Sequence, residues 1–116
     1  MLLVVSLFTV KNREAKEFLI RSLRPGGAWQ STARRIAPQI IDIEILERVD
    51  DGAGAVCLCL DLWKSIEAYY CACHTPKVQD LFLARRQLAD SSFELGTFTL
   101  APPPGETIEI ASTSLN

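Results

Sequence analysis

The sequence lacks the features that direct a chain to nucleic acid or to a membrane. Lysine and arginine number 12 against 14 acidic residues, which gives a formal net charge of −2 at pH 7, whereas nucleic-acid binding usually shows as a clustered basic excess. No apolar run approaches the roughly 18 residues that span a membrane. We therefore expect a cytoplasmic protein that binds neither nucleic acid nor a membrane.

Histidine is scarce, and the cysteines are not spaced as metal ligands usually are. The one histidine is His74, and the four cysteines form two pairs with a single residue between partners, Cys57 with Cys59 and Cys71 with Cys73. Structural zinc sites usually leave two or more residues between neighbouring cysteines. We therefore expect no bound metal, and we interpret the thiols as small buried or half-buried side chains in a reducing compartment.

Apolar residues, in contrast, are abundant for a short chain. Hydrophobic residues make up 48% of the 116 residues, and this length fits a single domain that hides roughly two-thirds of its unfolded surface on folding. A small monomer has an unfavourable ratio of surface to volume, so part of the apolar surface is expected to lie against a partner chain. The composition thus favours a dimer.

The first third of the chain predicts a strand followed by a helical block. Residues 2–10 are apolar and rich in β-branched side chains, and they lack the basic start and the cleavage site of a signal peptide, so they predict a strand. Asn12 is expected to cap a helix that residues 25–27, Pro-Gly-Gly, interrupt and Pro38 ends. The positions expected to face the core are Ala15, Phe18, Leu19, Leu23, Trp29, Ala33 and Ile36.

A hairpin is predicted next. Residues 40–49 alternate, with Ile41, Ile43 and Ile45 on a dry face and mostly charged residues on the other. Residues 50–52, Asp-Asp-Gly, predict the turn. The returning strand, residues 55–63, is apolar on both faces, so we expect both faces to be covered.

The rest of the domain is predicted to be a second helical block and a last strand. Ser65 can cap a helix, and Thr75 followed by Pro76 restarts it with proline at the first helical position. Residues 92–100 then predict a strand. Residues 102–116 are expected to lie outside the domain of residues 1–101, either as a disordered tail or as a short strand added to a partner's sheet.

This order of elements predicts an α+β fold of the ferredoxin-like βαββαβ type, with a four-stranded antiparallel sheet and helices on one face. The other face of such a sheet needs cover. Two copies packed sheet to sheet would provide it, which is a second reason to expect a homodimer.

Residues 63–68, Trp-Lys-Ser-Ile-Glu-Ala, followed by Thr75 and Pro76, resemble the antibiotic biosynthesis monooxygenase family of the dimeric α+β barrel superfamily. Members carry a tryptophan at the end of the third strand, a serine two residues later and Glu-Ala at the helix start. The resemblance implies a homodimer with a pocket in each subunit between sheet and helices. It also implies oxidation of a small aromatic, phenol- or quinone-like compound by molecular oxygen without a cofactor.

The resemblance also indicates pocket residues. Trp63 and Tyr69 match positions that line the pocket in members that oxidise polyketides. Those members have an asparagine four residues before the tryptophan, and this chain has Cys59 there. They have an arginine about twenty residues after the tryptophan, where this chain has Leu83, with Arg85 two residues further on. Trp63, Tyr69 and Cys59 are therefore the predicted substrate-binding residues, although a tryptophan at a strand end also serves as a core residue.

Two residues are candidates for catalysis. His74 titrates near neutral pH and could be a general base; at a helix junction it could also cap the helix or face water. Arg85 lies on an otherwise apolar stripe, and a buried guanidinium needs an anion. That anion is either a ligand or an internal carboxylate such as Asp61, and we favour the internal pair.

Two functions follow from these observations. The first is a cofactor-independent monooxygenase that acts on a small aromatic compound, as the retained Trp63 and Tyr69 favour. The second is a non-catalytic dimeric module that binds a hydrophobic small molecule, as the missing asparagine and arginine favour.

Overall fold

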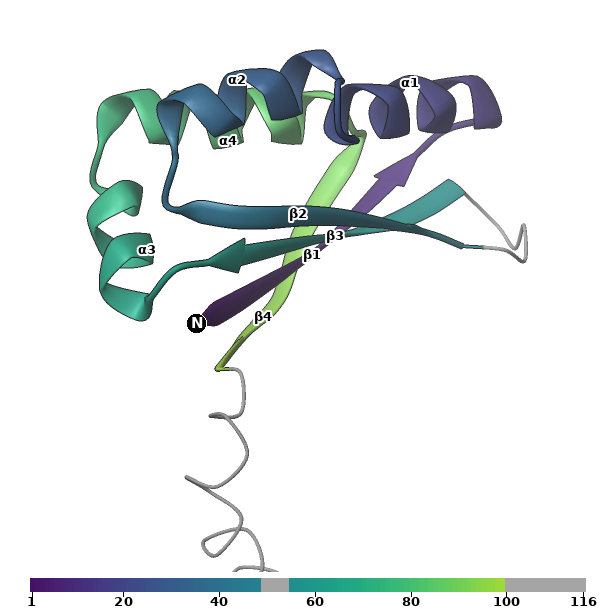
Figure 1. The fold of residues 1–116 in the computed structure, drawn as a ribbon. Helices are drawn as coiled ribbons and strands as arrows, with labels where there is room; N and C mark the ends of the chain where they lie inside the picture. The colour runs from purple at the N-terminus through teal and green to yellow at the C-terminus, as the bar shows by residue number, and fades with distance from the viewer. Residues whose placement is uncertain (49–54, 100–116) are drawn as a thin grey trace, which may run out of the picture.

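The computed structural model describes residues 1–48 and 55–99 and has the predicted α+β architecture (Figure 1). In chain order, the elements are β1 (Leu2–Val10), α1 (Arg13–Leu23), α2 (Ala28–Ile36), β2 (Ile40–Glu47), β3 (Ala55–Trp63), α3 (Ile66–Cys73), α4 (Pro76–Gln87) and β4 (Ser91–Thr99). The expected order of strands and helical blocks is confirmed, and each helical block consists of two helices.

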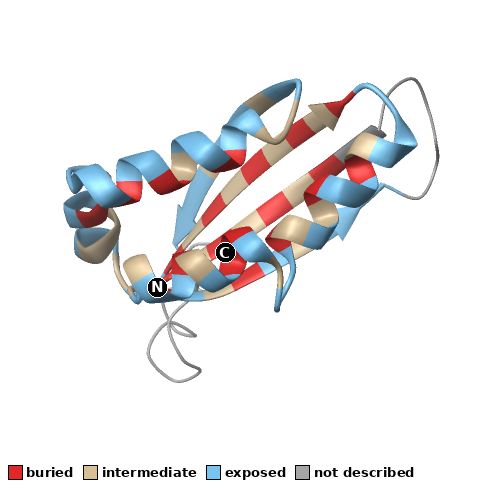
Figure 2. Ribbon diagram, turned by 90° about the horizontal axis from the view of Figure 1, so that it is seen from above, coloured by how far each residue is buried: buried red, intermediate tan, exposed pale blue. Residues whose placement is uncertain are grey.

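The four strands form one antiparallel sheet in the order β2-β3-β1-β4. Helices α1, α2 and α4 lie over one face of this sheet, and α3 lies at its end, after β3 (Figure 1). Seen from the helix side, buried residues alternate along the central strands with half-buried ones (Figure 2). The ferredoxin-like fold class is confirmed.

The helix boundaries follow local signals in the sequence. The side chains of Asn12 and Ser65 accept hydrogen bonds from the backbone N–H groups of Ala15 at 2.8 Å and Ala68 at 3.0 Å, which satisfies donors in the first turns of α1 and α3. Between α1 and α2, a Cβ on Gly27 would lie 2.2 Å from the carbonyl oxygen of Arg21. Only glycine fits this close turn.

The inward face of α1 differs from the predicted one at two positions, Lys16 and Phe18. Lys16, Leu19 and Leu23 are buried at helical spacing, whereas Phe18 is 54% exposed. The prediction that Phe18 faces the core is wrong, because neighbouring residues on a helix point about 100° apart and Leu19 occupies the inward position. Lys16 is buried because its Nζ lies 2.9 Å from Oε1 of Glu47 on β2.

A register shift in β2 changes which isoleucines face the helices. The shift lies between Ile40 and Asp42, so that Ile40 pairs with Trp63 and Ile43 with Asp61. Ile41 is the extra residue and is 45% exposed. The prediction that Ile41 shares the dry face is wrong, because a bulge interrupts the alternation that a period of two assumes.

A second shift, between β1 and β4, directs an acidic side chain toward the helices. Ser6 pairs with Glu94, but Val5 pairs with Gly96, which leaves Leu95 as the extra residue. Directly opposed residues of an antiparallel pair share a face of the sheet. Glu94 therefore lies on the helix side, as Ser6 does.

The face of the sheet turned away from the helices is largely apolar, although it also carries Asp42 and Glu44 of β2, which pair with Leu62 and Leu60. Phe93 and Phe98 pair with Leu7 and Leu3, so the β4 bulge places both aromatic rings on this face, where they are 64% and 53% exposed. The other apolar side chains of this face are half-buried or exposed; they are Val5, Leu46, Leu58, Leu60 and Leu62. Within the part of the chain that the structure describes, therefore, no helix lies over this side of β3 (Figure 1).

Three predictions concern residues outside the described ranges: the turn at residues 50–52, the domain boundary at residue 101 and the tail at residues 102–116. Within the described ranges, no helix is long and apolar enough to cross a bilayer. The same ranges contain no group of three histidine, cysteine or acidic side chains that could hold a metal ion.

Candidate active site

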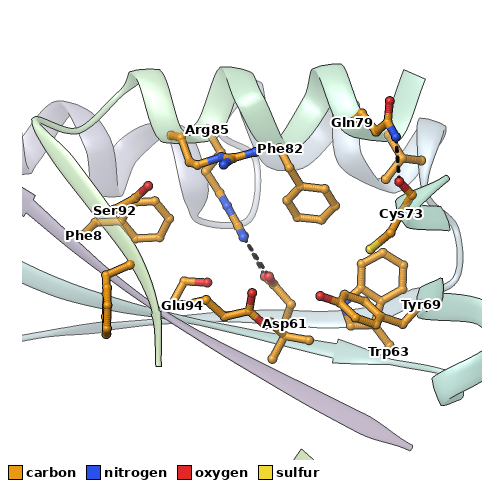
Figure 3. A pocket seen from close by; sticks show the side chains of 15 residues that line it. Phe8, Asp61, Trp63, Tyr69, Cys73, Gln79, Phe82, Arg85, Ser92 and Glu94 are labelled. Carbon is orange, nitrogen blue, oxygen red and sulfur yellow. Dashed lines mark hydrogen bonds and ion pairs between the residues drawn. The ribbon is translucent and has the colours of Figure 1, made fainter. Parts of the chain in front are cut away.

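A cavity of about 380 Å³ lies between the helix side of the sheet and helices α3 and α4. Its lining mixes apolar and polar side chains from β1, β3, α3, α4 and β4. Its lining residues include Ser6, Trp63, Tyr69, Cys73, Arg85 and Glu94 (Figure 3). The pocket that the family resemblance implied, between sheet and helices, is thus present in the single chain.

A buried ion pair lies at the base of this cavity. The Arg85 guanidinium reaches from α4 to the Asp61 carboxylate on β3, with Nη1 2.8 Å from Oδ1 and Nη2 2.9 Å from Oδ2 (Figure 3). The Arg85 and Asp61 side chains are only 6% and 1% exposed. This is the internal pair favoured from the sequence, and it is confirmed.

The pair also determines the charge of Arg85. Burial works to lower the pKa of the guanidinium, but the Asp61 carboxylate and Cys59 more than offset burial, and the pKa of Arg85 is raised above its ordinary value. Arg85 therefore remains a cation, and both oxygen atoms of Asp61 are engaged. Neither group is available to transfer a proton.

Three aromatic rings surround the guanidinium. Its Cζ lies 5.4 Å from the ring centroid of Phe8, 4.8 Å from that of Trp29 and 4.7 Å from that of Phe82. Rings at this distance attract a cation through their quadrupole. The Trp29 ring is held in turn by a 2.8 Å hydrogen bond from its Nε1 to the carbonyl oxygen of Leu81. The sequence did not predict that Phe8, Trp29 and Phe82 surround Arg85, because these residues are far apart in the sequence.

Cys59 supports the ion pair and is not one of the residues that line the cavity. The Arg85 Nη1 donates to its Sγ at 3.1 Å, and the Sγ lies 3.4 Å from Oδ1 of Asp61. Burial, followed by the Asp61 charge, raises the pKa of the Cys59 thiol far above its usual range. The thiol is thus a neutral packing partner where the resembling family has an asparagine.

Trp63 and Tyr69 meet in the cavity wall, as the resemblance implies. Their rings form an edge-to-face pair with centroids 5.2 Å apart. Burial, followed by the charges of Cys73 and Glu94, raises the pKa of Tyr69 well above its usual value, and a hydrogen bond to Cys73 adds to this effect. The Tyr69 hydroxyl therefore keeps its proton near neutral pH.

Two buried N–H donors in the wall have no partner among residues 1–48 and 55–99. They are Nε1 of Trp63, whose side chain is fully buried, and Nε of Arg85. A buried donor without an acceptor costs about 1–3 kcal/mol relative to a paired one. Both side chains border the cavity, with the donor atoms themselves buried, so a small shift of the wall would let an oxygen atom of a bound ligand become the missing acceptor.

His74 lies outside this arrangement. It is the C-cap residue of α3, is exposed, and its Nδ1 lies 2.7 Å from the carbonyl oxygen of Tyr70. It is not one of the cavity-lining residues. The structure therefore brings together Trp63, Tyr69 and Arg85, but it does not bring His74 to them.

Glu94 is the acidic residue of the rim that sequence reasoning missed. It comes from β4, and Figure 3 shows its side chain beside Asp61 on the sheet side of the cavity. The alternation of β4 alone could not assign it, because the bulge at Leu95 reverses the pattern within the strand.

No protein-family model matches the sequence, and no curated protein matches it. Solved structures do match over most of their length. SnoaB, a cofactor-independent oxygenase from Streptomyces nogalater, is 19% identical, with 90% of this chain and 97% of that chain covered and a TM-score of 0.55. A dimeric protein of unknown function with a ferredoxin-like fold from Bacteroides fragilis is 11% identical, with 85% and 95% covered and a TM-score of 0.60.

Other enzymes share the fold as well. A hydroxynitrile lyase from Passiflora edulis is 10% identical, with 88% of this chain and 95% of that chain covered and a TM-score of 0.60. At these identities the matches establish the fold and leave the reaction open. The resemblance inferred from residues 63–68 is thus confirmed at the level of the ferredoxin-like fold.

Proposed function

We propose that the cavity binds a small aromatic compound of the phenol or quinone type and that the protein oxidises it with molecular oxygen without a cofactor. The observation that carries this proposal is the pair of donors without a partner among the described residues, Trp63 Nε1 and Arg85 Nε, in the wall of a cavity that is also lined by aromatic and aliphatic side chains. A flat aromatic ligand with a carbonyl or phenolate oxygen matches both the apolar wall and the donors.

The size of the cavity suits such a ligand. An apolar cavity of about 150 Å³ in another protein accepts benzene. A cavity of about 380 Å³ therefore has room for two or three fused rings. The aromatic side chains of Phe8, Trp63 and Phe82 offer faces and edges against which such rings pack.

The chemistry needs an electron-rich form of the substrate. When a hydroxylated anthrone or a similar compound loses a proton, its anion can pass an electron to oxygen, and the two radicals combine into a hydroperoxide. Loss of water then gives a quinone, so that one oxygen atom enters the ring and the other leaves as water with two substrate hydrogens. The donors on Trp63, Arg85 and Tyr69 would stabilise the negative oxygen of the anion, and the apolar wall would exclude water.

In this scheme Arg85 acts as a fixed donor. Its charge is neutralised by Asp61, so it offers a hydrogen bond from Nε without attracting free anions into the cavity. Cys59 contributes by holding Arg85 in place. The scheme assigns no step to His74.

We also propose that the protein works as a homodimer. The two copies would be joined through the face of the sheet that is turned away from the helices, called here the bare face. The exposed Phe93 and Phe98, with the half-buried leucines beside them, make an apolar surface that a second sheet would cover. A dimeric protein with this fold is among the similar structures.

A second function is favoured by one observation. The Asp61 carboxylate is fully engaged by Arg85, so the inner end of the cavity offers no free base. A non-catalytic module that binds a hydrophobic small molecule needs none.

Oxygen uptake separates the two functions. The wild type and Trp63→Phe are compared with a panel of hydroxylated anthrones and quinols in an oxygen electrode, with binding measured in parallel by fluorescence. Oxygen consumption that depends on Trp63 supports the oxygenase. Micromolar binding with no turnover of any substrate supports the non-catalytic module.

A further inference from the structure

Glu94 is an exposed carboxylate among the residues that line the cavity. The register places Glu94 opposite Ser6, a cavity-lining residue of β1. No hydrogen bond or ion pair within residues 1–48 and 55–99 engages it. Its charge also acts on the inner groups, because it contributes to raising the pKa of both Tyr69 and Arg85.

The second carboxylate, the tyrosine and the glutamine of the wall are unsuited to accept a proton. Asp61, the second carboxylate among the lining residues, gives both oxygen atoms to Arg85. The raised pKa keeps Tyr69 protonated, and Gln79, whose Nε2 donates to the Cys73 carbonyl oxygen at 2.8 Å, has no ionisable group. A bound substrate therefore meets one free carboxylate.

The cavity lining thus offers two kinds of group. Trp63 and Arg85 each carry a buried N–H donor with no partner among the described residues, and Glu94 contributes a carboxylate. A ring system with a carbonyl oxygen and an acidic C–H or O–H would be bound by both kinds. Removal of that proton would place negative charge on the carbonyl oxygen through conjugation, where donors can stabilise it.

We infer that Glu94 is the general base that removes the proton from a conjugated carbonyl substrate in this cavity. The step rests on the proposed function and concerns its first reaction. The bond between the proton and the substrate carbon or oxygen breaks, its electron pair delocalises onto the carbonyl oxygen, and the proton forms a new O–H bond on Glu94. Glu94 is exposed, so its proton then passes to solvent, and no electron is exchanged with another reactant.

Anaerobic hydrogen–deuterium exchange tests this step apart from oxidation. With 1,8-dihydroxyanthrone in D2O and no oxygen, exchange of the acidic ring C–H is followed by NMR. Wild type is expected to accelerate the exchange over buffer, and Glu94→Gln is expected to lower the enzyme-dependent rate at least about 100-fold, since a positioned base typically contributes this much. Glu94→Asp, which keeps a carboxylate on a shorter side chain, is expected to retain part of the rate.

Two controls accompany the measurement. Glu17→Gln removes an exposed carboxylate on α1 that is not one of the cavity-lining residues, and it should exchange at the wild-type rate. Binding of the anthrone, measured by fluorescence, should change little in Glu94→Gln, which separates loss of the base from loss of the ligand.

The results distinguish this inference from the proposed function. Wild-type rates of exchange in Glu94→Gln, or no acceleration by the wild type, would overturn the role of Glu94. Exchange that depends on Glu94 without any oxygen uptake in air would keep that role and overturn the oxygenase proposal.

Discussion

Arg85 of α4 and Asp61 of β3 form a bidentate ion pair in the interior, with N–O distances of 2.8 and 2.9 Å. The pair joins a helix to the central part of the sheet at the base of the cavity. Removing two charges from water is expensive, and their mutual attraction compensates only when the geometry is good and further hydrogen bonds satisfy them. Here the Cys59 thiol and three aromatic rings complete the surroundings of the guanidinium.

Breaking this pair is expected to destabilise the fold strongly. Asp61→Asn leaves the Arg85 charge buried without a counter-ion, and the free energy of unfolding should fall by about 3–5 kcal/mol in urea denaturation. The double variant Asp61→Leu with Arg85→Met removes both charges and should recover most of that loss. As a control, Asp42→Asn affects an ion pair with Arg34 that is half exposed and 3.9 Å long, and it should cost less than about 1 kcal/mol. Equal effects of the two single variants would contradict the prediction.

The indole N–H of Trp63 is expected to select ligands that carry an oxygen acceptor. In Trp63→Phe the affinity for a hydroxyanthraquinone should fall about tenfold, the effect of losing one hydrogen bond of about 1.4 kcal/mol. The affinity for anthracene, which has the same ring system without oxygen, should change much less. Fluorescence titration measures both constants, and a parallel loss for the two ligands would indicate that Trp63 acts through shape alone.

The bare face of the sheet is expected to carry the dimer interface. Phe98→Glu introduces a charge into that face and should convert the dimer into a monomer in sedimentation-velocity experiments at micromolar concentration. Phe18→Glu is a matched control, because Phe18 of α1 is 54% exposed and Phe98 is 53% exposed, but Phe18 lies on the helix side. A wild type that sediments as a monomer, or a Phe98→Glu variant that stays dimeric, would refute the interface.

A ligand in the cavity is expected to shield one of two nearby cysteines. Cys73 is half-buried and lines the cavity, whereas Cys71 is exposed and does not. Alkylation by iodoacetamide, read by peptide mass spectrometry, should slow about tenfold at Cys73 when a hydroxyanthraquinone is present at about ten times its dissociation constant, and should be unchanged at Cys71. Equal protection of both thiols would point to binding elsewhere.

Cys57 is expected to make the fold less stable at alkaline pH. Burial, followed by the charge of Glu47, raises the pKa of Cys57 to about 11, whereas a cysteine in an unfolded chain has a pKa of about 8.5. As the pH rises, the unfolded chain loses the Cys57 proton before the folded chain does. The contribution of the protonated Cys57 thiol to the free energy of unfolding is therefore complete below about pH 8.5 and disappears as the pH rises toward 11. In Cys57→Ala the unfolding free energy should fall less steeply over this interval in urea denaturation at several pH values. A slope as steep as that of the wild type would assign the effect to another group.

The elements of the fold could be predicted from local patterns. The Asn12 and Ser65 caps, the Pro-Gly-Gly break at residues 25–27 and the order of strands and helical blocks depend on neighbours within a few positions, and the structure has each of them. The pairing of Arg85 with Asp61 was also accessible, because a cation on an apolar helix stripe requires a buried anion.

The sequence by itself therefore determined the α+β class, the helix boundaries and the presence of a buried charge on α4. The tertiary structure alone decided that Ile41 turns outward, that Glu94 reaches the cavity rim, and that Trp63 and Arg85 share one wall while His74 lies outside it. The physical reason is that these relations depend on strand register. A single bulge reverses which side chains face the helices, and the partner strand, distant in sequence, determines where that bulge lies.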